Sequence, residues 1–90
     1  MTVKQQETKN ASLRRHLVAW ITARPGRWLL GISVTDDVRL HLRHIGIHTS
    51  GEVLAKELRK AQRKGEIRKR IRLGTCYVEY TAVEEAKGVV

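Results

Sequence analysis

The sequence contains no phenylalanine, one cysteine and one proline, and its remaining aromatic residues are two tryptophans and two tyrosines. Leucine, isoleucine and valine must therefore fill most of the core. The single Cys76 excludes an internal disulfide and a cysteine-based zinc knuckle, and it fits a reducing compartment. No apolar run is long enough to span a bilayer, and the polar first ten residues lack the apolar stretch of a signal peptide. We expect a cytoplasmic protein that has no membrane partner.

Acidic residues are also scarce, since nine Asp and Glu stand against 18 Lys and Arg, which gives a net charge of +9 over 90 residues. A chain of this length forms a single domain. Half of the positive charge lies between residues 56 and 72, where nine Lys and Arg accompany two Glu. Such clustering is expected of a surface that meets a phosphate backbone. The balance of charge therefore favours a nucleic acid as the partner.

The residue patterns of common catalytic sites are missing from the sequence. There are no paired carboxylates, no nucleophile beside a base and no glycine-rich phosphate loop, so we expect neither an enzyme nor a cofactor. His41, His44 and His48 lie close together in sequence. No carboxylate or thiol is placed to complete a tetrahedral metal site with them. We therefore expect these histidines to be solvated or to contact phosphate, with no metal bound.

The first half of the chain predicts a flexible tail over residues 1–10, followed by a helix that Ser12 caps. One face of this helix is apolar, and Arg14 points away from it. The apolar positions are Leu13, Leu17, Val18, Trp20 and Ile21. Pro25 and Gly26 end the helix. Residues 27–34 are then expected to form an extended connector, with a short strand near residues 32–34.

The segment over residues 35–46 admits two interpretations. Thr35 followed by Asp36 and Asp37 is a good helix start, and Gly46 supplies a stop. Residues 38–43 also alternate between apolar and polar, as a strand would after a hairpin turn at residues 35–37. We favour the helix.

The best-defined element is a helix that opens with a capping box over residues 49–52, in which Thr49 is the cap and Glu52 reaches back to it. Leu54, Leu58 and Ala61 share its buried face, and Gly65 ends it. The exposed side is basic. It carries Lys56, Arg59, Lys60 and Arg63.

Residues 66–81 predict a hairpin with a two-residue turn at Gly74-Thr75. In this register one face is mainly apolar and pairs Leu73 with Cys76, Ile71 with Val78, and Lys69 with Tyr80. The other face is basic and pairs Arg72 with Tyr77, Arg70 with Glu79, and Arg68 with Thr81. Residues 83–90 are expected to form a second flexible tail. The expected core consists of Leu17, Ile21, Leu42, Leu54, Leu58, Ile71 and Val78.

The order helix, short strand, helix, helix and hairpin resembles the winged helix-turn-helix class over residues 11–82. The closest resemblance runs from Leu54 to Ile67, which is similar to the end of a recognition helix that passes into the first wing strand. Residues 25–28 resemble the break after the first helix in small bacterial and phage regulators. The stretch from Gly46 to Leu54 is longer than the tightest helix-turn-helix sequences use. Members of this class that bind left-handed nucleic acids carry an Asn and a Tyr on the third helix and prolines in the wing. This sequence lacks those signature residues.

The resemblance implies an α+β fold, with three helices and a C-terminal two-stranded hairpin as the wing. It also implies that the start of the third helix enters the major groove, so that Ser50, Gly51, Val53 and Lys56 face bases. Arg59, Lys60 and Arg63 would follow along the helix, while Arg68, Arg70 and Arg72 would grip phosphates or an A·T-rich minor groove. Tyr77 would contact a sugar or stack. The alternative is a solvated helix face, and a hairpin in which Glu79 neutralises Arg70.

On this basis we expect a sequence-preferring double-stranded DNA-binding protein, as a bacterial or phage transcriptional regulator or genome-organising factor associated with the nucleoid. An RNA-binding basic module and a protein-interaction domain of the same class are the alternatives. A homodimer is compatible with the pattern but is not indicated by it.

Overall fold

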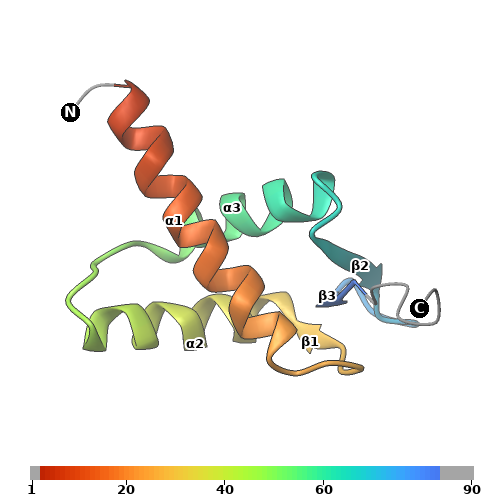
Figure 1. Ribbon diagram of the computed structural model, residues 1–90. Helices are drawn as coiled ribbons and strands as arrows, with labels where there is room; N and C mark the ends of the chain where they lie inside the picture. Colours follow the sequence, from red (N-terminus) through yellow and green to blue (C-terminus); the bar gives the residue numbers. More distant parts are fainter. Residues whose placement is uncertain (1–2, 84–90) are drawn as a thin grey trace, which may run out of the picture.

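The computed structural model describes the backbone of residues 3–83 and the side chains of residues 8–83, so the predicted tail beyond Val83 lies outside the described residues. The fold is α+β, with three helices and a three-stranded antiparallel sheet. The elements are α1 (Val3–Thr22), β1 (Leu29–Leu30), α2 (Gly31–His44), α3 (Gly51–Arg63), β2 (Ile67–Ile71) and β3 (Val78–Ala82). Figure 1 shows the sheet at one end of the helices.

The core forms where the three helices meet the base of the sheet. Each helix contributes residues three or four positions apart, as an amphipathic helix requires. They are Leu13, Leu17 and Ile21 of α1, Val34, Val38 and Leu42 of α2, and Leu54, Leu58 and Ala61 of α3, joined by Ile67 and Tyr80 of the sheet. Five of the seven predicted core residues are fully buried, and Val78 packs against the cluster.

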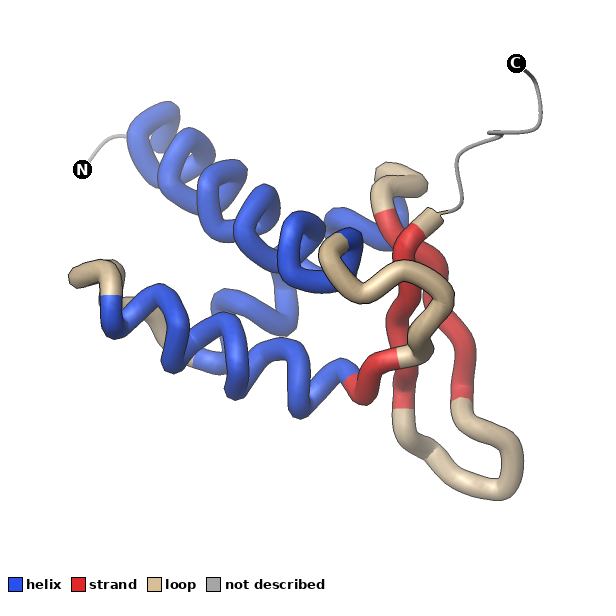
Figure 2. Tube along the Cα trace, turned by 60° about the horizontal axis from the view of Figure 1, so that its bottom comes forward, coloured by secondary structure: helices blue, strands red, loops and turns tan. Residues whose placement is uncertain are grey.

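Ile71 was expected in the core, and that prediction is wrong because its side chain is 62% exposed. Ile67 occupies the expected place and is 2% exposed. Both isoleucines lie on β2 with the same parity, but Ile67 is at the end that joins α3, whereas Ile71 is at the far end. Figure 2 shows that the hairpin extends beyond the helices at that far end, which agrees with the exposure of Ile71.

Helix α1 begins at Val3, so the predicted start at Ser12 is wrong and residues 3–10 continue the helix instead of forming a separate tail. The physical reason is composition. Lys, Gln and Glu lose little side-chain entropy in a helix, and neither Pro nor Gly interrupts residues 3–22. The helix ends at Thr22, shortly before Pro25 and Gly26, and Gly26 adopts the left-handed φ of 75°.

Two predictions near the start of α2 are also wrong. The strand is Leu29–Leu30 instead of residues 32–34, and α2 begins at Gly31 instead of after Thr35. Thr35 lies inside the helix, where its Oγ1 donates a hydrogen bond of 2.9 Å to the carbonyl of Ile32. The first residue of the helix packs closely against the sheet, since a Cβ at Gly31 would lie only 3.0 Å from Cε2 of Tyr80.

Residues 38–44 are helical, so the helix favoured for this segment is confirmed and the strand alternative is wrong. Gly46 has a φ of 84°, and the amides of Gly46 and Ile47 donate to the carbonyls of Arg43 and Leu42. These bonds satisfy carbonyls that the end of a helix leaves without intrahelical partners. The predicted stop at Gly46 is therefore confirmed.

Helix α3 is confirmed, but its cap is Ser50 instead of Thr49. The Ser50 hydroxyl oxygen accepts a hydrogen bond of 3.2 Å from the amide of Val53. At the other end Gly65 has a φ of 79°, and the amides of Gly65 and Glu66 close the last turn onto Gln62 and Ala61. This tight end directs the chain immediately into β2, as the sequence predicted.

The predicted register of the hairpin is confirmed within the strands, since β2 and β3 pair Arg68 with Thr81, Arg70 with Glu79, and Ile71 with Val78; the predicted pair of Leu73 with Cys76 is not formed, because Leu73 lies in the turn. Strand β1 adds to β3 on the other side, so the sheet order is β1-β3-β2. The predicted two-residue turn is wrong. Its central residues are Leu73 and Gly74, because the Thr75 amide donates to the Arg72 carbonyl at 3.0 Å and Gly74 has a φ of 77°.

Candidate nucleic-acid interface

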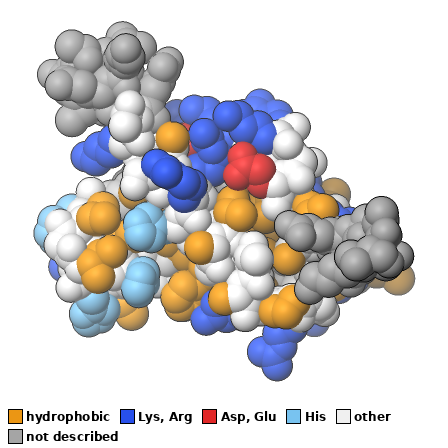
Figure 3. Space-filling model, in the orientation of Figure 1, with side chains coloured by type: hydrophobic (Ala, Val, Ile, Leu, Met, Phe, Trp, Pro, Cys, Tyr) orange, Lys and Arg blue, Asp and Glu red, His pale blue; other side chains and the backbone are white. Residues whose placement is uncertain are grey.

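The outward side of α3 carries a stripe of cations, which we call the α3 basic stripe and define as Lys56, Arg59 and Arg63. Their spacing of three and four residues places them on one side of the helix, and all three are exposed. The opposite side holds Leu54, Leu58 and Ala61 in the core. Figure 3 shows Lys and Arg side chains gathered over α3. Burial of one face therefore leaves the cations facing solvent.

The remaining predicted site residues of α3 are used in part by the fold. The Ser50 hydroxyl oxygen is occupied as the helix cap. Val53 packs partly against the core, and Gly51 is half-buried. Lys60 turns toward Glu57, with its Nζ 3.2 Å from Oε2. Among the four residues expected to face bases, Lys56 is the one that is positively charged, and its side chain is exposed.

The hairpin arginines lie on a different side from the α3 basic stripe. The guanidinium carbons of Arg68 and Arg70 stand 5.9 and 4.2 Å from the ring centre of Trp28. Arg70 also donates from Nε to Oε1 of Glu79 at 2.9 Å, so the pairing considered as an alternative is formed. Tyr80 is the neighbour of Glu79 on β3, so its side chain lies on the opposite face of the sheet, where it packs into the core with Leu58. Arg68 and Arg70 therefore occupy the sheet face that points away from α3.

Two further predicted residues, Arg72 and Tyr77, lie at the end of the hairpin, and both are exposed. Their backbones are joined, because the Arg72 amide donates to the Tyr77 carbonyl at 2.8 Å. The loop between them projects from the body of the fold, as Figure 2 shows. The structure thus presents two separate basic elements, the α3 basic stripe and the projecting hairpin end.

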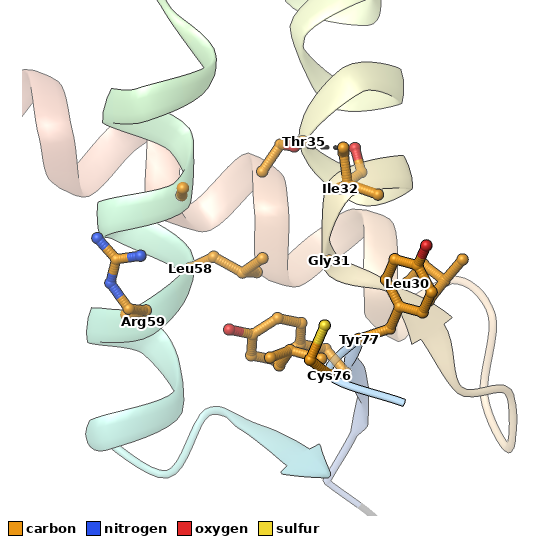
Figure 4. A pocket seen from close by; sticks show the side chains of 11 residues that line it. Leu30, Gly31, Ile32, Thr35, Leu58, Arg59, Cys76 and Tyr77 are labelled. Atoms are coloured by element: carbon orange, nitrogen blue, oxygen red, sulfur yellow. Dashed lines mark hydrogen bonds between the residues drawn. The ribbon is translucent and has the colours of Figure 1, made fainter. Parts of the chain in front are cut away.

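A hollow of about 340 Å³ lies between these two elements. Figure 4 shows its lining, with Leu58 and Arg59 on α3, Gly31 and Ile32 at the start of α2, and Tyr77 on the hairpin. Tyr80 also lines it, and burial raises the pKa of this phenol while the nearby Arg59 charge lowers it in part. This hollow is not predictable from the sequence, because its walls come from three distant segments.

Helix α2 starts at the edge of the hollow without a side-chain cap. Leu30 occupies the cap position and makes no capping hydrogen bond through its side chain, and the first turn contains no acid. The backbone amides at the start of a helix form a partial positive charge that favours anions. This end of α2 therefore adds to the positive character contributed by Arg59.

Sequence reasoning missed a buried ion pair that positions α3. Glu57 is 1% exposed, and its Oε1 accepts from Nη1 of Arg14 at 3.0 Å. Arg14 was expected to point away from the core, and that prediction is wrong. A signal was present, because Glu57 follows Leu54 by three residues and precedes Ala61 by four, on the apolar face. The pair ties α1 to α3 and so fixes the orientation of the α3 basic stripe.

Two of the four histidines, His16 and His41, face each other across α1 and α2. The His41 ring stands 6.4 Å from that of His16 and 6.0 Å from that of Trp20, between α1 and α2. Across residues 8–83, no three His, Cys, Asp or Glu side chains are grouped closely enough to hold a metal ion. Within the same part of the chain, no helix is both long and apolar enough to cross a membrane.

Comparison of the chain with protein-family models, with curated proteins and with solved structures finds no significant match.

Proposed function

We propose that the chain is a winged helix-turn-helix protein that binds double-stranded DNA, with α3 in the major groove and the hairpin as its wing. The observation that carries the proposal is the α3 basic stripe, whose three cations are exposed beside a projecting hairpin. The order of elements, with a strand after α1 and a sheet order of β1-β3-β2, fits this class. A groove of B-DNA admits one helix, and a hairpin beside it then reaches the flanking backbone.

The positions of the charges assign different roles to the two elements. Lys56 is the exposed cation nearest the start of α3, so it is the side chain best placed to donate to guanine. Arg59 and Arg63 follow along the helix and meet phosphates. Arg70 is held by Glu79 and Trp28, so Arg72 at the hairpin end contributes more to backbone contact.

The hollow between α3 and the hairpin is lined mainly by apolar side chains, so in this proposal the phosphates of the duplex meet its edge and not its floor. Arg59 stands at its rim, and the uncapped start of α2 lies at its edge. Both features favour a phosphate group. With its net charge of +9, the protein acts in this proposal as a transcriptional regulator or genome-organising factor on the bacterial or phage chromosome.

The test is a titration of duplex DNA and of duplex RNA of equal length at several salt concentrations. Replacing Lys56, Arg59 and Arg63 by Ala should lower the slope of log K against log salt by up to about three units, since each phosphate contact contributes about 0.9. The matched control replaces Arg15, Arg39 and Arg43, which are also exposed but lie on α1 and α2. This control should change the slope much less.

Equal losses in the two triple variants would show that DNA is attracted by total charge and not by α3, which contradicts the proposal. Tighter binding of RNA than of DNA at equal salt would favour the RNA-binding alternative. Sequence readout needs a second pair of measurements. Replacing Ser50 and Lys56 by Ala should reduce the difference in affinity between a target duplex and a random duplex. Replacing Arg68 and Arg72 by Ala should instead weaken binding to both duplexes equally.

A further inference from the structure

The tip of the hairpin presents an apolar side chain entirely to solvent. Leu73 is 99% exposed, which is the highest value among the large hydrophobic residues that the structure describes. Ile71 and Tyr77 next to it are also more than half exposed. A leucine in this position gains nothing from burial within the fold. Its place at the end of a projecting hairpin (Figure 2) leaves it accessible to a partner.

The turn that holds Leu73 is fixed by hydrogen bonds. The Arg72 carbonyl accepts from both the amide and the Oγ1 hydroxyl of Thr75, at 3.0 and 2.9 Å. The Thr75 hydroxyl oxygen in turn accepts from the amide of Tyr77 at 3.2 Å. Gly74 supplies the left-handed backbone that this turn requires, with a φ of 77°. These bonds hold the backbone that presents Leu73, so the turn itself does not need to be ordered when Leu73 binds.

The surroundings of Leu73 indicate a polyanion as the partner. Lys69 lies on β2 and Arg72 directly follows this strand, and none of the tip residues 71–77 is acidic. A second copy of this hairpin would bring like charges together, which disfavours self-association through the tip. Proteins that bind the minor groove often insert an apolar side chain between base steps, and cations beside it hold the adjacent phosphates.

We propose that Leu73 acts as a wedge that enters the minor groove and bends the duplex. This inference rests on the proposed DNA binding and adds an architectural activity to it. Leu73 separates two adjacent base pairs, while Arg72 contacts the flanking phosphates. The cost of unstacking is smallest at flexible pyrimidine–purine steps and is offset when the bent duplex meets more of the protein. The protein should therefore prefer duplexes that carry a TA step where the hairpin lands.

The test measures bending by energy transfer between dyes at the two ends of a short duplex, with either a central TA step or an A-tract. The wild-type protein should bend the TA duplex by roughly 20–90° and bind it several-fold more tightly than the A-tract duplex. Leu73→Ala should lose most of the bend and of this preference, while the salt slope stays unchanged. Because Leu73 packs against nothing, its replacement should leave the thermal unfolding midpoint unaltered.

The matched control is Leu40→Ala, which makes the same chemical change at an exposed leucine of α2. It should bend DNA like the wild type. Unchanged bending by Leu73→Ala would overturn the wedge and leave DNA binding intact. Failure of the wild-type protein to bind duplex DNA at any salt would instead overturn both the wedge and the proposed function. Leu73-dependent binding to phosphatidylserine vesicles without DNA bending would assign the tip to a membrane and also overturn the wedge.

Discussion

Glu57 carries a negative charge into the core, and two cations accompany it. Arg14 reaches it from α1 at 3.0 Å, and Lys60 reaches it from one helical turn along α3 at 3.2 Å. Removing an ion from water is costly unless it is paired, so the side chain depends on these partners. Arg14 is itself largely buried, whereas the Lys60 side chain is 45% exposed. Arg14 is therefore the partner that matters most for stability.

Arg14→Ala should destabilise the protein by about 3 kcal/mol or more, because it leaves a buried carboxylate without its main partner. Lys60→Ala should cost less than about 1 kcal/mol, since a half-exposed pair is screened by solvent. The double variant Arg14→Met with Glu57→Leu should recover most of the loss. Urea unfolding measures all three variants. A cost below 1 kcal/mol for Arg14→Ala would show that Glu57 does not depend on this pair.

Tyr80 predicts an alkaline limit to stability. Burial raises the pKa of its phenol above the ordinary 10.0, and the Arg59 charge lowers it in part. The folded state thus holds the proton more tightly than the unfolded chain does. Stability from this group is fully present below about pH 10 and falls as pH rises further, while the unfolded tyrosine ionises first.

Tyr80→Phe should therefore lose less stability than the wild type between about pH 9 and pH 11. Tyr77→Phe is the control, because Tyr77 is more than half exposed and has no buried phenol to protect. Urea unfolding across this pH range gives the comparison. Parallel loss of stability in wild type and Tyr80→Phe would mean that Tyr80 does not set the alkaline limit.

At the scale of elements, the hairpin shows what strand parity determines and what it leaves open. Alternation in the sequence predicts which side chains share a face, and the register of β2 and β3 agrees with it. It does not predict how far the helices cover that face. Ile67 and Ile71 share the same parity, yet only Ile67 lies within reach of the helical core.

Ile67→Ala should cost about 2–5 kcal/mol, because it removes a fully buried side chain. Ile71→Ala should cost less than about 0.5 kcal/mol, as for other exposed positions. The two substitutions are chemically identical and lie on one strand, so each is the control for the other. Similar costs in denaturant unfolding would show that the hairpin folds back over Ile71.

The same distinction explains which helix boundaries could be predicted from the sequence. The ends of α2 and α3 depend on Gly46 and Gly65, whose left-handed backbone is a local property, and both were predicted. The start of α2 at Gly31 lies against the Tyr80 ring, in a contact between distant segments that local spacing does not indicate. The cation stripe of α3 likewise follows from local spacing. The contact between the Arg70 guanidinium and the Trp28 ring requires β1 to pair with β3, and the sequence does not indicate that pairing.

At the scale of the whole molecule, a net charge of +9 on 90 residues affects the protein alone and the protein on DNA in opposite ways. In the free protein, exposed cations repel one another, and added salt screens that repulsion within a Debye length of about 10 Å at 0.1 M. In the complex, each phosphate contact releases counterions, so added salt weakens binding. Varying the salt concentration therefore separates the repulsion among cations in the free protein from the attraction between the protein and DNA.

Raising sodium chloride from about 0.05 to 0.5 M should raise the thermal midpoint of the free protein and lower that of the protein in excess duplex. At low salt the duplex should add about 2.7 kcal/mol of stability when its free concentration is about a hundred times Kd, by mass action. As salt rises the complex dissociates, so the two midpoints should converge. Thermal unfolding with and without duplex, at equal protein concentration, follows both curves. Midpoints that rise in parallel would show that the duplex is not held by charge, and the α3 basic stripe would then lose its assigned role.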